Sequence, residues 1–149
     1  MRRRQAIAVL ALAGVFVALY LWLHKLGVIG ELQCGAGGCE TVQASPYADF
    51  LGLPVALYGV GGYLAVLIVS LVAARPAYAA RRGFDVALAA AASLGFAFTL
   101  YLTALELFVI HAICRWCVAS AAIITAIWVI SLASVAGRAS RTPPPRTGS

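Results

Sequence analysis

The sequence has few charged residues. Lysine, arginine, aspartate and glutamate together make up 11% of the 149 residues, whereas 63% are hydrophobic. A chain with so few polar groups cannot cover the surface of a water-soluble globule. A soluble protein is therefore excluded, and we expect the chain to lie in a lipid bilayer.

Long apolar stretches indicate how the chain crosses the bilayer. A helix that spans the hydrocarbon core needs about 20 mostly apolar residues. Because such segments fill most of the chain, we predict an all-α integral membrane protein, with a four-transmembrane-helix domain over residues 1–137 and a basic, proline-rich cytoplasmic tail over 138–149. The four predicted helices cover residues 6–26, 55–74, 85–110 and 117–136.

The first apolar stretch lacks a small-residue cleavage site, although three arginines precede it as in a signal peptide. It is also too long for the apolar region of a signal peptide. Tyr20 and Trp22, near its far end, fit the aromatic belt of a membrane interface. We therefore interpret this stretch as the first transmembrane helix, with a cleaved signal peptide as the alternative.

Basic residues are divided unevenly between the two ends of the predicted helices. One side carries only Lys25 and Arg115, together with the acids of the first loop. Because loops rich in basic residues stay in the cytoplasm, we expect both termini to be cytoplasmic and the protein to lie in the inner (plasma) membrane. The net charge of +6 then reflects topology and does not indicate nucleic acid binding. The opposite side carries Arg2, Arg3, Arg4, Arg75, Arg81, Arg82, Arg138, Arg141 and Arg146.

Cysteine is also scarce, and the four cysteines form two pairs, Cys34/Cys39 and Cys114/Cys117. The first pair lies in the predicted loop 27–53, and the second lies at the short turn 111–116. This topology places both pairs on the extracytoplasmic side, where disulfides persist. Both pairs therefore face the same compartment, in which they can form disulfides.

The spacing within each pair favours a redox relay. Cys114-Arg-Trp-Cys117 is a CxxC sequence at the start of the fourth predicted helix. There the free N–H groups, the helix dipole and Arg115 favour a thiolate, which is the attacking species in disulfide exchange. The glycine-rich spacer 35–38 allows Cys34 and Cys39 to approach each other. A disulfide that closes so short a ring would add only about 2 kcal/mol to stability through its constraint on the unfolded chain, so it would be a weak structural brace.

Two other interpretations of the cysteines stay open. Four thiolates can bind zinc, since CxxC is also a zinc half-site, but such a site needs a structured knuckle, and here one pair begins a membrane helix. Two inert disulfides could instead brace a membrane scaffold. A CxxC at a helix start is an unusual choice for a permanent bridge.

Two blocks of sequence around the cysteines resemble the vitamin K epoxide reductase family. Residues 34–59 are similar to the first loop and second-helix entry of that family, and read CGAGGCETVQASPYADFLGLPVALYG. Residues 105–121 resemble the third-helix end and redox centre of its bacterial, DsbB-like members, and read LELFVIHAICRWCVASA. The resemblance covers about residues 6–136.

This resemblance implies a four-helix bundle around a quinone (ubiquinone or menaquinone) that works as a thiol oxidase. A thioredoxin-fold (DsbA-like) partner would pass electrons to the loop pair, then to the CxxC, and then to the quinone. Matched by position, Cys34 would exchange with the partner, Cys39 would attack Cys114, and Cys117 would face the quinone.

Three features of the relatives are missing here. Relatives often have more than four residues between the loop cysteines. Vertebrate enzymes carry a tyrosine four residues after the CxxC, where this chain has Ala121, so simple quinone reduction is favoured and quinone-epoxide reduction is the alternative. Some bacterial relatives continue into a thioredoxin domain, whereas this chain ends in a proline-rich tail. We therefore expect the partner in trans.

Two ionisable residues near the CxxC are candidate quinone-site residues. Glu106 lies two turns before Cys114, which is roughly 12 Å along a continuous helix. A carboxylate at that depth is costly, on the order of 3 kcal/mol or more, so it needs a partner. Glu106 could have a functional role, in which it delivers protons or orients the quinone. It could equally have a structural role, in which it only makes a hydrogen bond between helices. His111 is a candidate acid or base, or a histidine that simply lies at the interface.

The remaining candidates for the quinone site are polar or aromatic. Ser45 and Tyr47 could bond a quinone or order the loop, and Ser45 could instead cap a short helix that begins at Pro46. Phe50, Phe108 and Trp116 could stack on a quinone ring, although aromatic residues are common at membrane interfaces without a ligand.

Overall fold

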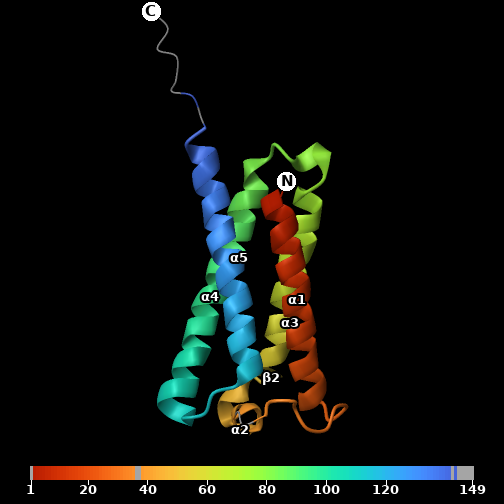
Figure 1. Ribbon diagram of the computed structural model, residues 1–149, viewed down its shortest axis with the longest axis vertical. Coiled ribbons are helices and arrows are strands. Elements are labelled where there is room, and N and C mark those ends of the chain that lie inside the picture. Colours follow the sequence, from red (N-terminus) through yellow and green to blue (C-terminus); the bar gives the residue numbers. More distant parts are fainter. Residues whose placement is uncertain (1, 36–37, 142, 144–149) are drawn as a thin grey trace, which may run out of the picture.

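Four long helices run side by side along the length of the molecule (Figure 1). The computed structural model describes residues 2–35, 38–141 and 143. Each long helix contains a window apolar enough to cross a membrane, which confirms the predicted four-helix class. The helices are α1 (Arg2–Lys25), α3 (Val55–Ala73), α4 (Arg82–Leu105) and α5 (Arg115–Ala139).

Small residues let the helices pack closely. Gly14 of α1 faces Tyr63 of α3, and a Cβ at residue 14 would lie 2.4 Å from the tyrosine ring. Glycine at such a crossing allows two membrane helices to approach. The main core cluster then contains side chains from all four long helices, among them Ile7, Ala11, Tyr63, Leu88, Ala92 and Ile127.

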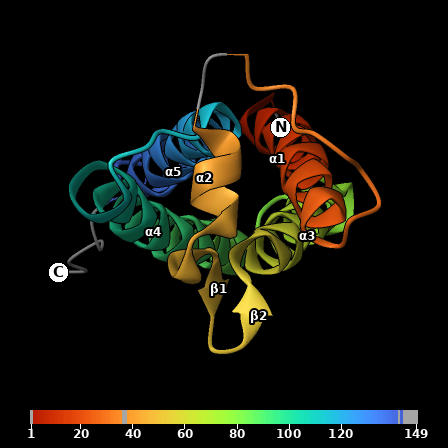
Figure 2. The same cartoon turned by 90° about the horizontal axis from the view of Figure 1, so that it is seen from below.

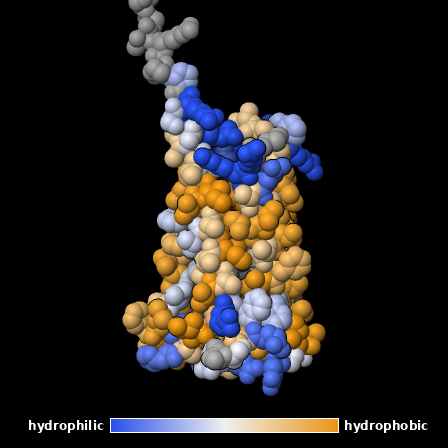
Figure 3. Space-filling view, viewed as in Figure 1, coloured by the Kyte–Doolittle hydropathy of each residue, from blue (hydrophilic) through white to orange (hydrophobic). Residues whose placement is uncertain are grey.

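The outer face of the bundle is apolar over its middle and hydrophilic at both ends (Figure 3). Large apolar side chains such as Val9, Phe16 and Leu94 are well exposed there. In a soluble protein so broad an exposed apolar surface would be a liability, but a bilayer solvates it. The belt therefore agrees with the membrane assignment made from composition.

A buried ion pair joins α1 to α4 at the end where α1 begins. Both nitrogens of the Arg4 fork bond the Asp85 carboxylate at 3.1 Å, and Arg4 also donates to the Ala73 carbonyl. Arg138 of α5 pairs with the same carboxylate. Removing one partner of such a buried pair typically costs about 3–5 kcal/mol, so these contacts fix all four long helices relative to one another at this end.

The opposite end of the bundle is covered by the segment that joins α1 to α3. It contains the short helix α2 (Cys39–Ala44), a 3-10 turn η1 (Pro46–Ala48) and a hairpin of β1 (Asp49–Phe50) and β2 (Leu53–Pro54). Figure 2 shows α2 lying across the centre of this end, between α5 and α1. Cysteine pairs and helix ends therefore meet there.

Short turns complete the connections. A 3-10 turn η2 (Pro76–Tyr78) links α3 to α4, and a π-helical turn η3 (Glu106–Ile110) extends α4. The predicted membrane segment 85–110 therefore corresponds to α4 and η3 together, and the structure begins it three residues earlier. The other predicted segments differ from the observed helices by four residues or fewer at each end.

Candidate redox site

The loop cysteines form a disulfide. Cys34 and Cys39 are bonded to each other, with their Cα atoms 6.2 Å apart. Cys39 is the first residue of α2 and is fully buried, and Cys34 is nearly so. Within the predicted spacer, Gly35 has a positive φ of 60°, a conformation that suits glycine, while residues 36 and 37 lie outside the described part of the chain.

The CxxC lies at the start of α5, as the sequence predicted. Cys114 is the N-cap residue, and its sulfur accepts the backbone N–H of Cys117 at 3.3 Å. Both sulfurs are free thiols. Cys114 is fully buried, whereas Cys117 lies one helical turn further in and is half-buried.

The two thiols differ in their surroundings. The pKa of Cys114 is lowered, chiefly by a hydrogen bond with the Cys117 side chain and further by the N–H groups of Cys117 and Trp116. Burial and the charge of Glu106 act in the opposite direction but are outweighed. Arg115, expected to favour the thiolate, instead reaches the Cys34 carbonyl at 3.4 Å. Cys114 is therefore the thiol that more readily forms the reactive thiolate. Hydrogen bonds at the start of the helix, and not a neighbouring cation, favour this charged form.

The two pairs are held against each other by the residues that precede them. The N–H of Gly38, just before Cys39, donates to the carbonyl of Ile113, just before Cys114, at 3.0 Å. Both cysteines belong to one buried cluster. A Cβ at residue 38 would lie 2.8 Å from the Ala112 Cβ, so only glycine allows this approach. The short spacer thus allows the two cysteine pairs to lie against each other.

Glu106 lies beside the CxxC, which corrects the distance expected from a continuous helix. The α-helix gives way to the π-turn at Glu106, His111 adopts a left-handed conformation with φ 56°, and the chain reverses. The Ala112 N–H bonds the Glu106 carbonyl, and the Glu106 Oε2 accepts the Cys114 N–H at 3.1 Å. Helix geometry alone could not reveal this reversal.

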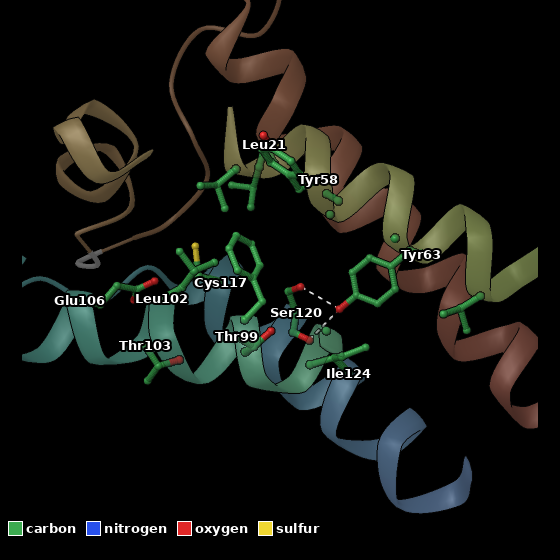
Figure 4. Close-up of a pocket in the computed structure, with 18 of the residues that line it drawn as sticks. Leu21, Tyr58, Tyr63, Thr99, Leu102, Thr103, Glu106, Cys117, Ser120 and Ile124 are labelled. Atoms are coloured by element: carbon green, nitrogen blue, oxygen red, sulfur yellow. Dashed lines mark hydrogen bonds between the residues drawn. The ribbon is translucent and has the colours of Figure 1, made fainter. Parts of the chain in front are cut away.

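A cavity inside the bundle borders Cys117 (Figure 4). Its volume is about 160 Å³, and its walls are mostly apolar. An apolar cavity of about 150 Å³ can hold one benzene ring, so this one has room for a single six-membered ring. Labelled wall residues include Leu21, Tyr58, Tyr63, Thr99, Leu102, Glu106, Cys117 and Ser120.

The sequence-predicted quinone residues differ in how close they lie to this cavity. Glu106 borders the cavity directly. Ser45 and Tyr47 line a smaller adjoining space, which also borders Cys117. Phe50 makes edge contacts with the rings of Tyr58 and Phe98, which are wall residues. Ser45 does not cap the short helix at Pro46, because its hydroxyl donates to the Val42 carbonyl instead.

Three further predicted residues, like Phe50, lie outside both spaces. Phe108 is 75% exposed on the outer face of the π-turn. His111 is exposed, because its left-handed backbone forms the outside of the reversal. Trp116 packs against Tyr20 of α1 with the two rings tilted and their centroids 4.9 Å apart. The structure therefore brings none of the three to the cavity.

Sequence reasoning missed several polar groups that surround Cys117. Gln43 of α2 places its amide nitrogen 3.9 Å from the Cys117 sulfur. Tyr63 of α3 hydrogen-bonds the Ser120 hydroxyl at 2.8 Å. Ser120 could have been found, since it follows Cys117 by three residues and so shares its helix face. Gln43 and Tyr63 gave no such signal, because only the fold brings them here.

The disulfide affects the metal interpretation. Cys34 and Cys39 cannot act as thiolate ligands while they are bonded to each other. Among the residues that the structure describes, no group of three or more His, Cys, Asp or Glu is arranged to hold a metal ion.

The fold and the cysteines together define an integral membrane oxidoreductase. A model of the vitamin K epoxide reductase family matches residues 5–132, which is most of the chain. The chain therefore belongs to this family. Its members are oxidoreductases that are associated with quinones.

The Cys117 side chain is predicted to set the acidity of Cys114. Cys117→Ser and Cys117→Ala each leave Cys114 as the single free thiol, but only serine keeps a hydroxyl that can donate to it. Titrating the ultraviolet absorbance of the thiolate against pH should give a lower pKa for Cys114 in the serine variant, because the hydrogen bond stabilises the charged form. Equal midpoints in the two variants would show that the hydrogen bond does not control this thiol.

Proposed function

We propose that this protein is a membrane thiol oxidase that passes electrons from a thioredoxin-fold partner to a quinone. Cys34 exchanges with the partner, Cys39 with Cys114, and Cys117 faces the quinone. The observation that carries the proposal is the placement of the CxxC, with the loop disulfide docked on one side and the cavity on the other.

Each turnover moves two electrons and two protons. A partner dithiol attacks the Cys34–Cys39 disulfide and leaves as a disulfide, so the loop becomes a dithiol. The loop dithiol then reduces a Cys114–Cys117 disulfide by the same exchange. Finally the CxxC dithiol returns to a disulfide as a bound quinone takes up two electrons and two protons and leaves as the quinol.

The observed cysteine states correspond to one point in this cycle. A loop disulfide together with a CxxC dithiol is the state in which the electrons have reached Cys114 and Cys117 but have not left. Cys117 then presents its sulfur at the cavity wall. This state is the one expected to react with a quinone.

Glu106 is proposed to handle protons at the quinone step. Its carboxyl is buried and borders the same cavity as the Cys117 thiol. A thiol that reduces a quinone must release its proton, and a carboxyl at the same cavity provides a route for it. Gln43, on the other side of Cys117, is proposed to orient the sulfur.

The proposed orientation follows the arginines. Both termini are placed in the cytoplasm, and the cysteine end faces the extracytoplasmic side of the plasma membrane, where a thioredoxin-fold partner would dock. Residues 1–137 form the membrane domain in this proposal, with 138–149 as a cytoplasmic tail. Supporting this arrangement, α1 begins and α5 ends at the same end of the bundle, opposite the cysteines (Figure 1).

Gly38→Ala tests the transfer between the two pairs. The added Cβ meets Ala112 and should push Cys39 away from Cys114. Since a misplacement of about 1 Å can cost on the order of 100-fold in rate, we expect quinol formation driven by reduced thioredoxin to fall by roughly 10- to 100-fold. Gly30→Ala is the matched control, because a Cβ there meets nothing within 4 Å. Similar rates in the two variants would contradict direct transfer from Cys39 to Cys114.

Glu106→Gln tests the proton route. Glutamine keeps an oxygen that can accept the Cys114 N–H, so the reversal at the end of α4 is preserved, but it cannot carry a proton. Because a positioned acid or base typically contributes about 10²–10⁴-fold, quinol formation should fall by at least roughly 100-fold. Glu40→Gln, at an exposed position of α2, is the control. A Glu106→Gln enzyme with full turnover would mean that residue 106 serves only as a hydrogen-bond acceptor.

A further inference from the structure

An open cavity of about 870 Å³ lies at the end of the bundle opposite the cysteines. It is bordered by the start of α1, the start of α4 and the end of α5. Figure 3 shows this end as a hydrophilic cap above the apolar belt. The arginines that line it are Arg2, Arg3, Arg4, Arg82, Arg138 and Arg141.

Positive charge in this cavity is mostly uncompensated. Asp85 is the one carboxylate among its lining residues, and it is already paired with Arg4 and Arg138. Six guanidinium groups and one carboxylate leave a net charge of plus five. Arg3 donates to the Ala133 carbonyl, which adds no negative charge. Like charges this close repel one another, so an anion in the cavity would stabilise the fold.

The arginine side chains that line the cavity indicate which kind of anion would bind. Guanidinium groups offer forked donors that match phosphate oxygens, and they remain charged at any physiological pH. Three of the arginines, Arg2, Arg82 and Arg141, are exposed, and among the described residues no carboxylate pairs with them. They are therefore available to a ligand, whereas Arg4 and Arg138 hold the helices together.

The location of the cavity indicates which molecule would carry the phosphate group. The cavity opens where the three helices leave the apolar belt, which is the depth of the lipid headgroups. Basic pockets between transmembrane helices at this depth bind anionic headgroups. We propose that this cavity is a binding site for the phosphate headgroup of an anionic phospholipid, distinct from the redox site and independent of the proposed reaction.

Lipid binding to two matched double variants tests the proposal. The test variant is Arg82→Gln with Arg141→Gln, which removes two exposed cavity arginines. The control is Arg75→Gln with Arg81→Gln, which removes the same charge from exposed positions at the same end of the bundle but outside the cavity. Each protein is purified in detergent and titrated with phosphatidylglycerol, with phosphatidylcholine, or with inorganic phosphate. Native mass spectrometry and the midpoint of thermal unfolding report binding.

Wild-type protein and the control should bind phosphatidylglycerol in preference to phosphatidylcholine, with a raised unfolding midpoint. The test variant should bind it roughly 30-fold more weakly, since each arginine near an anionic surface contributes about five-fold. Equal weakening in both double variants, or no preference for phosphatidylglycerol in the wild type, would overturn the site. Stabilisation by inorganic phosphate but not by phosphatidylglycerol would overturn the lipid as its source.

Discussion

The reversal of the chain between α4 and α5 is the constraint on which the redox site depends. Near a bilayer, backbone N–H and C=O groups must find partners within the protein. The π-turn and the left-handed His111 bend the chain back, and the Glu106 carboxyl then accepts the N–H of Cys114. One residue therefore accepts the N–H groups of the turn with its carbonyl, anchors the N-cap of the next helix with its side chain, and borders the cavity.

The consequences of this reversal extend in two directions. On the outer side, the exposed carbonyl of Ile113 receives the N–H of Gly38, which holds the loop disulfide against Cys114. On the inner side, α5 carries Cys117 and Ser120 down one face toward the cavity. In the proposed relay, a bulky protein partner and a membrane-embedded quinone would each react at its own end of a chain of four sulfurs.

The large features of this protein could be predicted from its sequence, because they depend on regular periods and on composition. Four apolar stretches predicted the four helices, and the CxxC was expected at the start of the last one, where the structure makes Cys114 the N-cap residue. The position of Glu106 could not be predicted, since a π-turn has no clear sequence signal and a continuous helix was assumed. Gln43 and Tyr63 were missed for a related reason, because they reach Cys117 from helices distant in sequence.

The central claim is that thiol oxidation and quinone reduction are one coupled reaction through Cys117. It is tested most directly by mixing the purified protein, without oxygen, with reduced thioredoxin and a short-chain quinone, and by counting quinol formed against dithiol consumed. The account predicts one quinol for each dithiol, and none above background with Cys117→Ser. Dithiol oxidation without quinol, or an unchanged yield in the variant, would contradict it.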